Sequence, residues 1–174
     1  MCAIHGITFK NPSLTKTMVE IARHRGPDGE GYFSDEYVSM AHNLLAITDS
    51  AEKAHQPWTS TDNKRILVYN GEIYNYRELR AELEKSGAKF TTNSDTEVLF
   101  KGIEMRGVEF LNAVDGMYGF AWYNAETLQL ILARDRSGTK PLFYNLGSRG
   151  LCFSSELRSL LSAVDNTRKL DRLG

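Results

Sequence analysis

The order of periodic segments along the chain constrains its fold more than any other feature of the sequence. Residues 75–87 and 94–107 carry helical apolar spacing, whereas short β-compatible runs dominate before residue 70 and after Gly116. A helix and a sheet each need a partner for their apolar face, so strands on both sides of two central helices indicate a mixed α and β domain. We expect sheets with helices packed on their outer faces.

The other segments follow from the same local signals. Ser13 can cap a helix that runs to Ala22, and a loop is expected after the breaker at residues 25–29. The expected strands are 1–9, 38–41, 44–48, 65–69, 116–124, 128–134, a short run near Phe143, and 151–153, and a last helix spans 155–163. No linker or internal repeat divides these segments, which predicts one domain.

A local signal lies before each of the two central helices. Asn70-Gly71 ends a β-rich run, but the residues after it suit a helix capped by Asn75, so we predict a turn from strand to helix. Ser94 and Glu97 have capping-box spacing, which places Asp95 in a first helical turn.

Composition narrows the class of protein. With 174 residues, 41% hydrophobic and 25% charged, the chain has the size and make-up of one soluble globular domain. Twenty-one basic and 22 acidic residues give a formal net charge of -1 without a basic block, which argues against nucleic-acid binding. No apolar run could span a membrane and no signal-peptide profile is present, so we expect a cytoplasmic protein without a membrane partner. Two cysteines without a CxxC pair, and four scattered histidines, predict neither a disulfide framework nor a metal site.

Cys2 directly follows the initiator methionine, so removal of Met1 would leave one residue with both a thiol and a free α-amine. A thiol attacks as its thiolate and, with an ordinary pKa of about 8.5, needs a base. An α-amine, with an ordinary pKa of about 7.7 to 8.0, can serve as that base. The pattern is typical of an N-terminal nucleophile, and the alternative is a buried small hydrophobe.

Histidine could supply the base instead. On a strand, positions 2 and 5 point to opposite faces because their offset is odd, so we expect His5 to be structural. His24, His42 and His55 could approach Cys2 only through tertiary structure, and structural roles are the expectation for all three.

An acyl-transfer site also needs hydrogen-bond donors for the oxyanion that develops on the substrate. Asn70 offers a side-chain amide and Gly71 an unhindered backbone N–H, although the dipeptide alone is also typical of an ordinary turn. Glu72 or Asp95 could bind a substrate ammonium group, although an aspartate in a first helical turn usually complements the helix dipole. With Cys2, these residues would supply a nucleophile, a base, oxyanion donors and an ammonium site.

Strings of residues along the whole chain are similar to one family. They are Met1-Cys2-Ala3-Ile4, HRGPDGEG (24–31), Gln56-Pro57, NGEIYNYRELR (70–80), SDTE (94–97), VDGMYGFAWYN (114–124), RDRSGTKPLFY (134–144) and FSSE (153–156). In this order they resemble the glutaminase domain of glutamine-dependent asparagine synthetase. The resemblance implies one class II (type 2) glutamine amidotransferase domain over residues 1–174, with the Ntn-hydrolase fold, an α+β four-layer αββα sandwich.

The resemblance also implies residue roles. Cys2 would be the nucleophile, its freed amine the base, and Asn70 with the Gly71 N–H the oxyanion hole. The residues implied to bind the substrate are Glu72, Asp95, Ile47, Thr48 and Arg25. Asp95 would pair with the ammonium group of glutamine, and residues 47–48 would line the pocket with main-chain contacts.

The implied reaction converts L-glutamine and water into L-glutamate and ammonia through a γ-glutamyl thioester on Cys2. In the full-length family a C-terminal synthetase domain receives the ammonia through an internal tunnel and uses ATP and aspartate. This chain contains no SGGxDS-type pyrophosphate loop, so ATP and magnesium are expected only in a synthetase domain absent from it, and no cofactor in residues 1–174. We expect the amino-terminal portion of a longer protein, with a stand-alone glutaminase as the alternative, and the sequence leaves homodimer formation open.

Three positions depart from the family pattern. Leu44 stands where the family commonly has the arginine that binds the α-carboxylate of glutamine, and leucine replaces none of a bidentate ion pair. Ala3 replaces the usual glycine or serine, and a retained Met1 would turn the catalytic amine into an amide. Leu44 and Met1 motivate an alternative, a catalytically impaired Ntn-like scaffold that packs on an ammonia-using synthetase domain. A further alternative is an amidotransferase with another acceptor, as in sugar-amidating or amidophosphoribosyl enzymes.

Overall fold

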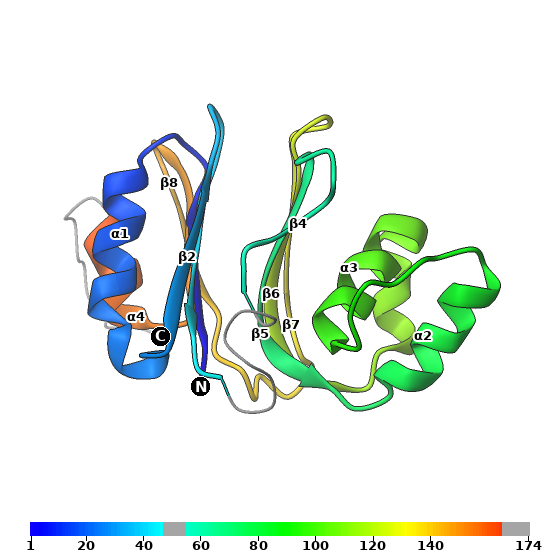
Figure 1. Ribbon diagram of the computed structural model, residues 1–174. Helices are drawn as coiled ribbons and strands as arrows, with labels where there is room; N and C mark the ends of the chain where they lie inside the picture. Colours follow the sequence, from blue (N-terminus) through cyan, green and yellow to red (C-terminus); the bar gives the residue numbers. More distant parts are fainter. Residues whose placement is uncertain (47–54, 165–174) are drawn as a thin grey trace, which may run out of the picture.

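Two antiparallel sheets lie face to face, and helices cover the outer face of each one (Figure 1). The computed structural model of the chain describes residues 1–46 and 55–164. The layers follow the order helix, sheet, sheet, helix, which confirms the αββα sandwich expected from the sequence.

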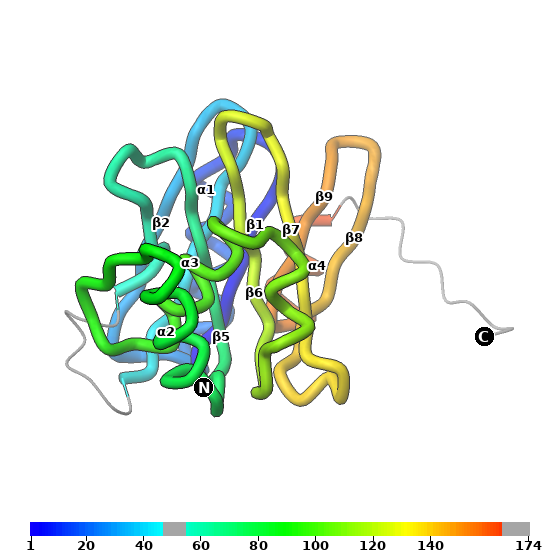
Figure 2. The backbone as a smooth tube through the Cα atoms, turned by 90° about the vertical axis from the view of Figure 1, so that its right-hand side faces the viewer, coloured from blue at the N-terminus to red at the C-terminus, as the bar shows by residue number. Residues whose placement is uncertain are grey.

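The first sheet has the strand order β2-β3-β1-β9-β8, and the second has the order β4-β5-β6-β7. The strands are β1 (Ala3–Ile7), β2 (Gly29–Ser34), β3 (Ser39–Leu44), β4 (Trp58–Thr59), β5 (Arg65–Ile73), β6 (Gly116–Asn124), β7 (Gln129–Arg134), β8 (Phe143–Gly147) and β9 (Gly150–Ser154). Figure 2 shows β6 with β7, and β8 with β9, as two hairpins whose turns lie at the top of the view. Strand β1 is the central strand of the first sheet, and Cys2 is the residue directly before it.

Helices α1 (Pro12–Ile21) and α4 (Leu157–Ala163) cover the first sheet, and α2 (Tyr76–Lys85) and α3 (Asp95–Arg106) cover the second (Figure 1). Short 3-10 helices follow α1 and α3, namely η1 (Arg23–Arg25) and η2 (Gly107–Ala113). Within residues 1–46 and 55–164, no helix is long and apolar enough to cross a membrane.

Alternation along β5 divides the core between two layers. Ile66 and Val68 pack with Ile4 of β1 between the two sheets. Leu67 and Tyr69 point the other way and pack with α2 and α3. Successive side chains of a strand point to opposite faces, so residue 70 continues the row that faces the first sheet.

The predicted end of β5 is wrong. Asn70-Gly71 is not a turn, because β5 continues to Ile73 and pairs with β6, with Asn70 opposite Gly119 and Gly71 opposite Tyr118. Side-chain volume explains the glycine, since a Cβ at residue 71 would lie 2.4 Å from the Met117 carbonyl oxygen. The Asn-Gly pair is therefore needed for close packing of two strands rather than for chain reversal.

A strand also replaces the predicted loop after Gly29. Strand β2 pairs with β3 along its whole length, from Gly29 opposite Leu44 to Ser34 opposite Ser39. A Cβ at Gly31 would lie 1.8 Å from the Gln56 carbonyl oxygen, so a neighbouring segment requires the glycine that lowers the local strand propensity.

Two predicted helix caps differ as well. Asn11, rather than Ser13, caps α1, because its Oδ1 accepts the Leu14 N–H at 3.1 Å. Asn75 does precede α2, but its side chain makes no cap and instead donates to the Ala113 carbonyl at 2.9 Å. A tertiary partner thus outcompetes the local cap at Asn75.

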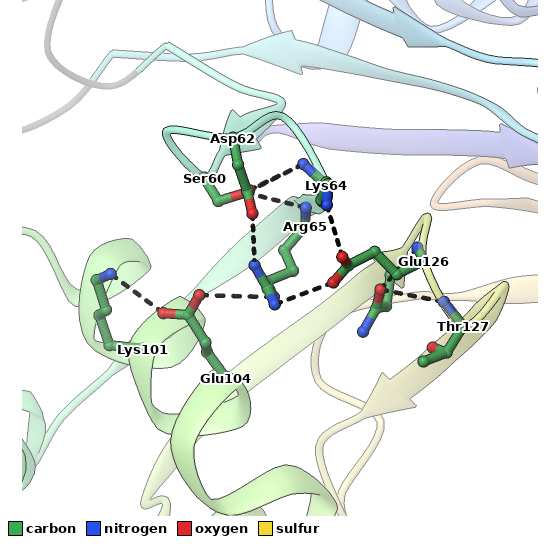
Figure 3. A network of polar contacts seen from close by, with 9 residues as sticks. Ser60, Asp62, Lys64, Arg65, Lys101, Glu104, Glu126 and Thr127 are labelled. Atoms are coloured by element: carbon green, nitrogen blue, oxygen red, sulfur yellow. Dashed lines mark hydrogen bonds and ion pairs between the residues drawn. The ribbon is translucent and has the colours of Figure 1, made fainter.

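A network of charged side chains joins the start of β5 to α3 and to the turn between β6 and β7 (Figure 3). Arg65 lies at its centre and pairs with Asp62 at 2.9 Å, Glu126 at 3.3 Å and Glu104 at 3.7 Å. Lys64 also pairs with Glu126, at 2.6 Å. These contacts tie together three segments at the end of β5 opposite to Asn70 and Gly71.

Candidate functional site

Cys2 lies directly before β1, and Leu45, the residue after β3, contacts its sulfur. The backbone N–H of Leu45 donates to Cys2 Sγ at 3.4 Å, and the thiol is 3.8 Å from the Leu45 carbonyl oxygen. These two contacts orient a thiol that is only partly buried.

Arg25 contacts the backbone of Cys2. Its Nε donates to the Cys2 carbonyl at 3.3 Å, and its Nη1 lies 3.6 Å from Glu156 Oε2. The arginine side chain is 12% exposed, and its Nη2 has no hydrogen-bond partner among the residues with described positions. Arg25 therefore supports the position of the nucleophile through contacts with protein groups, and the substrate-binding role that the resemblance implied stays a prediction.

His5 points away from the thiol, as the odd offset predicts. Its Nδ1 lies 2.9 Å from Ser154 Oγ and its Nε2 lies 2.9 Å from Asn43 Oδ1. Burial lowers the pKa of His5 to about 4, although the hydrogen bond with Asn43 opposes this fall. His5 is thus neutral near pH 7 and ties three strands of the first sheet together.

His42 is a second neutral, buried histidine. Burial, with a smaller contribution from the nearby His5, lowers its pKa to about 3. His24 lies on the surface, 3.8 Å from Glu156. Within residues 1–46 and 55–164, no hydrogen bond joins a histidine to Cys2, which agrees with the expectation of structural histidines.

Asn70 lies on β5, on the face of its sheet that looks toward β1. The residue is 3% exposed, yet its side-chain amide nitrogen has no hydrogen-bond partner in the described part of the chain. A buried amide nitrogen without an acceptor destabilises the folded protein. A ligand oxygen that accepts its hydrogen bond would remove this cost. Gly71 is the next residue, and because it has no side chain its backbone N–H is not covered by one.

Asp95 is the first residue of α3 and reaches back to β5. Its Oδ2 accepts the backbone N–H of Ile73 at 3.0 Å and the hydroxyl of Tyr69 at 2.7 Å. Burial, and then the Asp95 carboxylate, raise the pKa of Tyr69 well above its ordinary value, and the nearby Cys2 adds to the rise. Asp95 and Tyr69 are therefore in direct contact.

Tyr69 is a residue that the sequence reasoning missed. Positions 69, 71 and 73 share one face of a strand, so their spacing could have linked the tyrosine to Gly71.

Two anchors fix the start of α3. Ser94 caps the helix, since its Oγ accepts the Glu97 N–H at 3.2 Å, as predicted. The Glu97 carboxylate does not return to Ser94 but accepts the backbone N–H groups of Thr91 at 2.9 Å and Thr92 at 2.7 Å. The loop before α3 is held by this buried carboxylate, which fixes the position of Asp95.

The other predicted residues lie around this centre. Glu72 is exposed on β5, and Leu44 is buried at the end of β3. Ile47 and Thr48 lie outside the described residues.

Lys140 also escaped the sequence reasoning, although the RDRSGTKPLFY string contains it. Asp135 accepts the backbone N–H groups of Tyr118 at 3.2 Å, Thr139 at 2.9 Å and Lys140 at 3.0 Å. This loop leaves Lys140 9% exposed, with its Nζ 3.8 Å from Met1 Sδ.

Comparison with known proteins gives a consistent result. A family model described as a glutamine amidotransferase domain matches residues 1–174. Glutamine-hydrolyzing asparagine synthetase 1 of Bacillus subtilis (strain 168) is 39% identical over 174 residues, which cover 95% of this chain and 27% of that protein. Asparagine synthetase B of Escherichia coli (strain K12), also glutamine-hydrolyzing, is 36% identical over 168 residues, 92% of this chain and 30% of that protein. The chain thus spans less than a third of the length of these two relatives.

Solved structures share the fold. Glutamine phosphoribosylpyrophosphate amidotransferase of B. subtilis, complexed with ADP and GMP, matches with a TM-score of 0.76 at 23% identity, over 92% of this chain and 43% of that one. A structure described as the allosteric regulatory enzyme of purine biosynthesis matches with a TM-score of 0.79 at 24% identity, again over 92% of this chain and 43% of that one.

Proposed function

The chain belongs to the glutamine amidotransferase family, and from this premise we propose that it hydrolyses L-glutamine to L-glutamate and ammonia. The observation that carries the proposal is a partly exposed Cys2 thiol together with a buried Asn70 amide nitrogen that has no hydrogen-bond partner within residues 1–46 and 55–164. A nucleophile and an oxyanion donor are the two groups that acyl transfer needs most.

The reaction begins on a chain from which Met1 has been removed. The α-amine of Cys2 takes the thiol proton as Sγ attacks the side-chain amide carbon of glutamine. The carbon–nitrogen bond then breaks, and the proton passes from the amine to the leaving nitrogen, which departs as ammonia. Water gives a proton to the same amine, attacks the γ-glutamyl thioester and restores the thiol as glutamate leaves.

The oxyanion of each tetrahedral intermediate is stabilised by the Asn70 side-chain amide and the Gly71 backbone N–H. Asn70 makes no other hydrogen bond through its amide nitrogen within the described residues, so this donor is not lost to a competing protein group. Donors that are fixed before the reaction stabilise developing charge without reorganisation.

The amino-acid end of glutamine is bound by the acidic residues near β5. Asp95 pairs with the substrate ammonium group, and Glu72 contributes from the same strand as Asn70. Ile47 and Thr48 supply main-chain contacts, and Arg25 supports the site through Cys2. Leu44 leaves the α-carboxylate without the arginine that the family pattern contains, so weak glutamine binding is expected.

The ammonia is delivered to an ATP-dependent amidation of the asparagine-synthetase type. The relatives that support this acceptor are more than three times longer than the part that this chain matches, so the acceptor site lies in a C-terminal synthetase domain or a partner protein. ATP and magnesium belong to that site, and residues 1–174 work without a cofactor.

Glutamate release by the Met1-trimmed protein tests the proposal. We expect turnover of L-glutamine that Cys2→Ala abolishes and Cys152→Ala retains, because Cys152 lies on the other side of the first sheet among α1 and α4 residues. Intact mass should show one equivalent of a glutamine-analogue electrophile on Cys2. A trimmed protein with neither turnover nor labelling would instead support the scaffold alternative.

A further inference from the structure

Tyr69 lies on β5, the strand that carries the proposed oxyanion donors, and its ring covers one side of Gly71. The residue is 3% exposed, and its Cε2 lies 2.6 Å from the position that a Cβ on Gly71 would occupy. The ring therefore lies across the helix-facing side of Gly71 and carries the hydroxyl from position 69 to the carboxylate of Asp95, 2.7 Å away. Glycine at 71 is what leaves room for this path.

The hydroxyl and the Ile73 N–H both donate to the same oxygen of Asp95, Oδ2. Oδ1 has no hydrogen-bond partner within residues 1–46 and 55–164. Two donors on one oxygen fix the rotation of a carboxylate and leave the other oxygen free for a cation. Oδ1 is therefore the oxygen of Asp95 that an ammonium group could approach.

We infer that Tyr69 is a positioning residue for the substrate ammonium group, which it serves by holding Asp95 through Oδ2. The inference rests on the proposed glutaminase function. Tyr69 does not touch the substrate; it acts through Asp95. Because the Tyr69 ring also contacts Gly71, the ammonium site and the oxyanion hole share one rigid support.

The tyrosine hydroxyl can play this part over the whole working range of pH. Burial and the adjacent carboxylate raise the pKa of Tyr69, so its proton stays on the phenol and is donated to Asp95. A hydrogen bond to a charged acceptor is stronger than one between neutral groups, which keeps the carboxylate ordered when the site is empty.

Tyr69→Phe in the Met1-trimmed protein tests this role, because it removes the hydroxyl and keeps the ring against Gly71. We expect KM for L-glutamine to rise about tenfold, the loss of a charge-assisted hydrogen bond, while kcat stays within about twofold. Glutaramate, which has the same terminal amide but no α-ammonium group, serves as the second substrate. Its kcat/KM should be equal in wild type and Tyr69→Phe.

Tyr123→Phe is the matched control. Tyr123 is also a buried tyrosine whose hydroxyl donates to an aspartate, Asp35, at 2.9 Å, but it lies toward the other end of the sheets. Its removal should leave KM for glutamine unchanged. Equal losses with glutamine and glutaramate in Tyr69→Phe would overturn the positioning role in favour of general damage to the site.

The two levels of the proposal fail separately. Turnover by wild type with an unchanged KM in Tyr69→Phe would overturn the role of Tyr69 alone. Absence of turnover in wild type would overturn the proposed function and, with it, this role.

Discussion

Acidification from pH 7 to pH 5 should destabilise this domain through two buried histidines. Burial lowers the pKa of His5 to about 4 and that of His42 to about 3, against an ordinary value of 6.5. The unfolded chain therefore takes up two protons as the pH falls below 6.5, whereas the folded chain stays unprotonated at both sites until a lower pH. Since the unfolded state binds more protons, the free energy of unfolding falls with the pH.

The size of the effect follows from the pKa difference. At pH 5 the pKa of a histidine in the unfolded chain lies about 1.5 units above the solution pH. One pKa unit corresponds to about 1.4 kcal/mol, so each buried histidine should lower the free energy of unfolding by about 2 kcal/mol. The two together should remove about 4 kcal/mol, a large part of the stability of a typical domain. This window lies above the pH at which most carboxylates titrate.

Urea unfolding at several pH values from 7 to 5 measures the loss. His42→Gln should roughly halve the dependence on pH, because one of the two sites is gone. A free energy of unfolding that stays constant from pH 7 to 5 would refute the reasoning, as would a wild-type slope in His42→Gln.

Three further substitutions examine the site and its support. Asn70→Ala should lower kcat for glutamine by about 10² to 10³ and leave the thermal midpoint almost unchanged, because its amide nitrogen has no partner in the described fold; a kcat near wild type would show that another donor serves the oxyanion. Leu44→Arg should lower KM by about 10-fold to 100-fold, since a charge-assisted pair contributes roughly 1.5 to 3 kcal/mol, and an unchanged KM would mean that another residue binds the carboxylate. Arg65→Met should lower the free energy of unfolding by about 1 kcal/mol at low salt and by less at high salt, because salt screens its ion pairs. The kcat should not change, because the three carboxylate partners lie away from Cys2. An equal loss of stability at low and high salt would argue against the ion pairs.

Prediction from sequence succeeded where one segment decides its own structure. Residues 116–124 are rich in aromatic side chains, which favour strands, and they form β6 with the predicted bounds. Gly87 was expected to end a helix, and its positive φ of 96° follows the last residues of α2. Both signals depend on neighbours within a few positions, which local pattern captures.

Prediction failed where a glycine is required for close packing against a distant segment rather than for a turn or loop. Asn70-Gly71 has the sequence of a turn, but a paired strand runs through it because β6 lies against Gly71. Gly31 weakens a strand locally, yet Gln56 leaves no room for a side chain there. In both places the partner, which lies far along the chain, decides the structure.

The sequence by itself determined the family, the thiol after the initiator methionine and the mixed α and β class, because motifs and periodicity are properties of neighbouring residues. Only the tertiary structure decided which groups meet. Cys2 contacts Leu45 across 43 positions, and Tyr69 reaches Asp95 across 26. Sheet pairing and the packing of helices on sheets bring such residues together, and hydrogen-bonding capacity selects which of them bond. The role proposed for Tyr69 depends on the tertiary structure, because only there does its hydroxyl donate to Asp95.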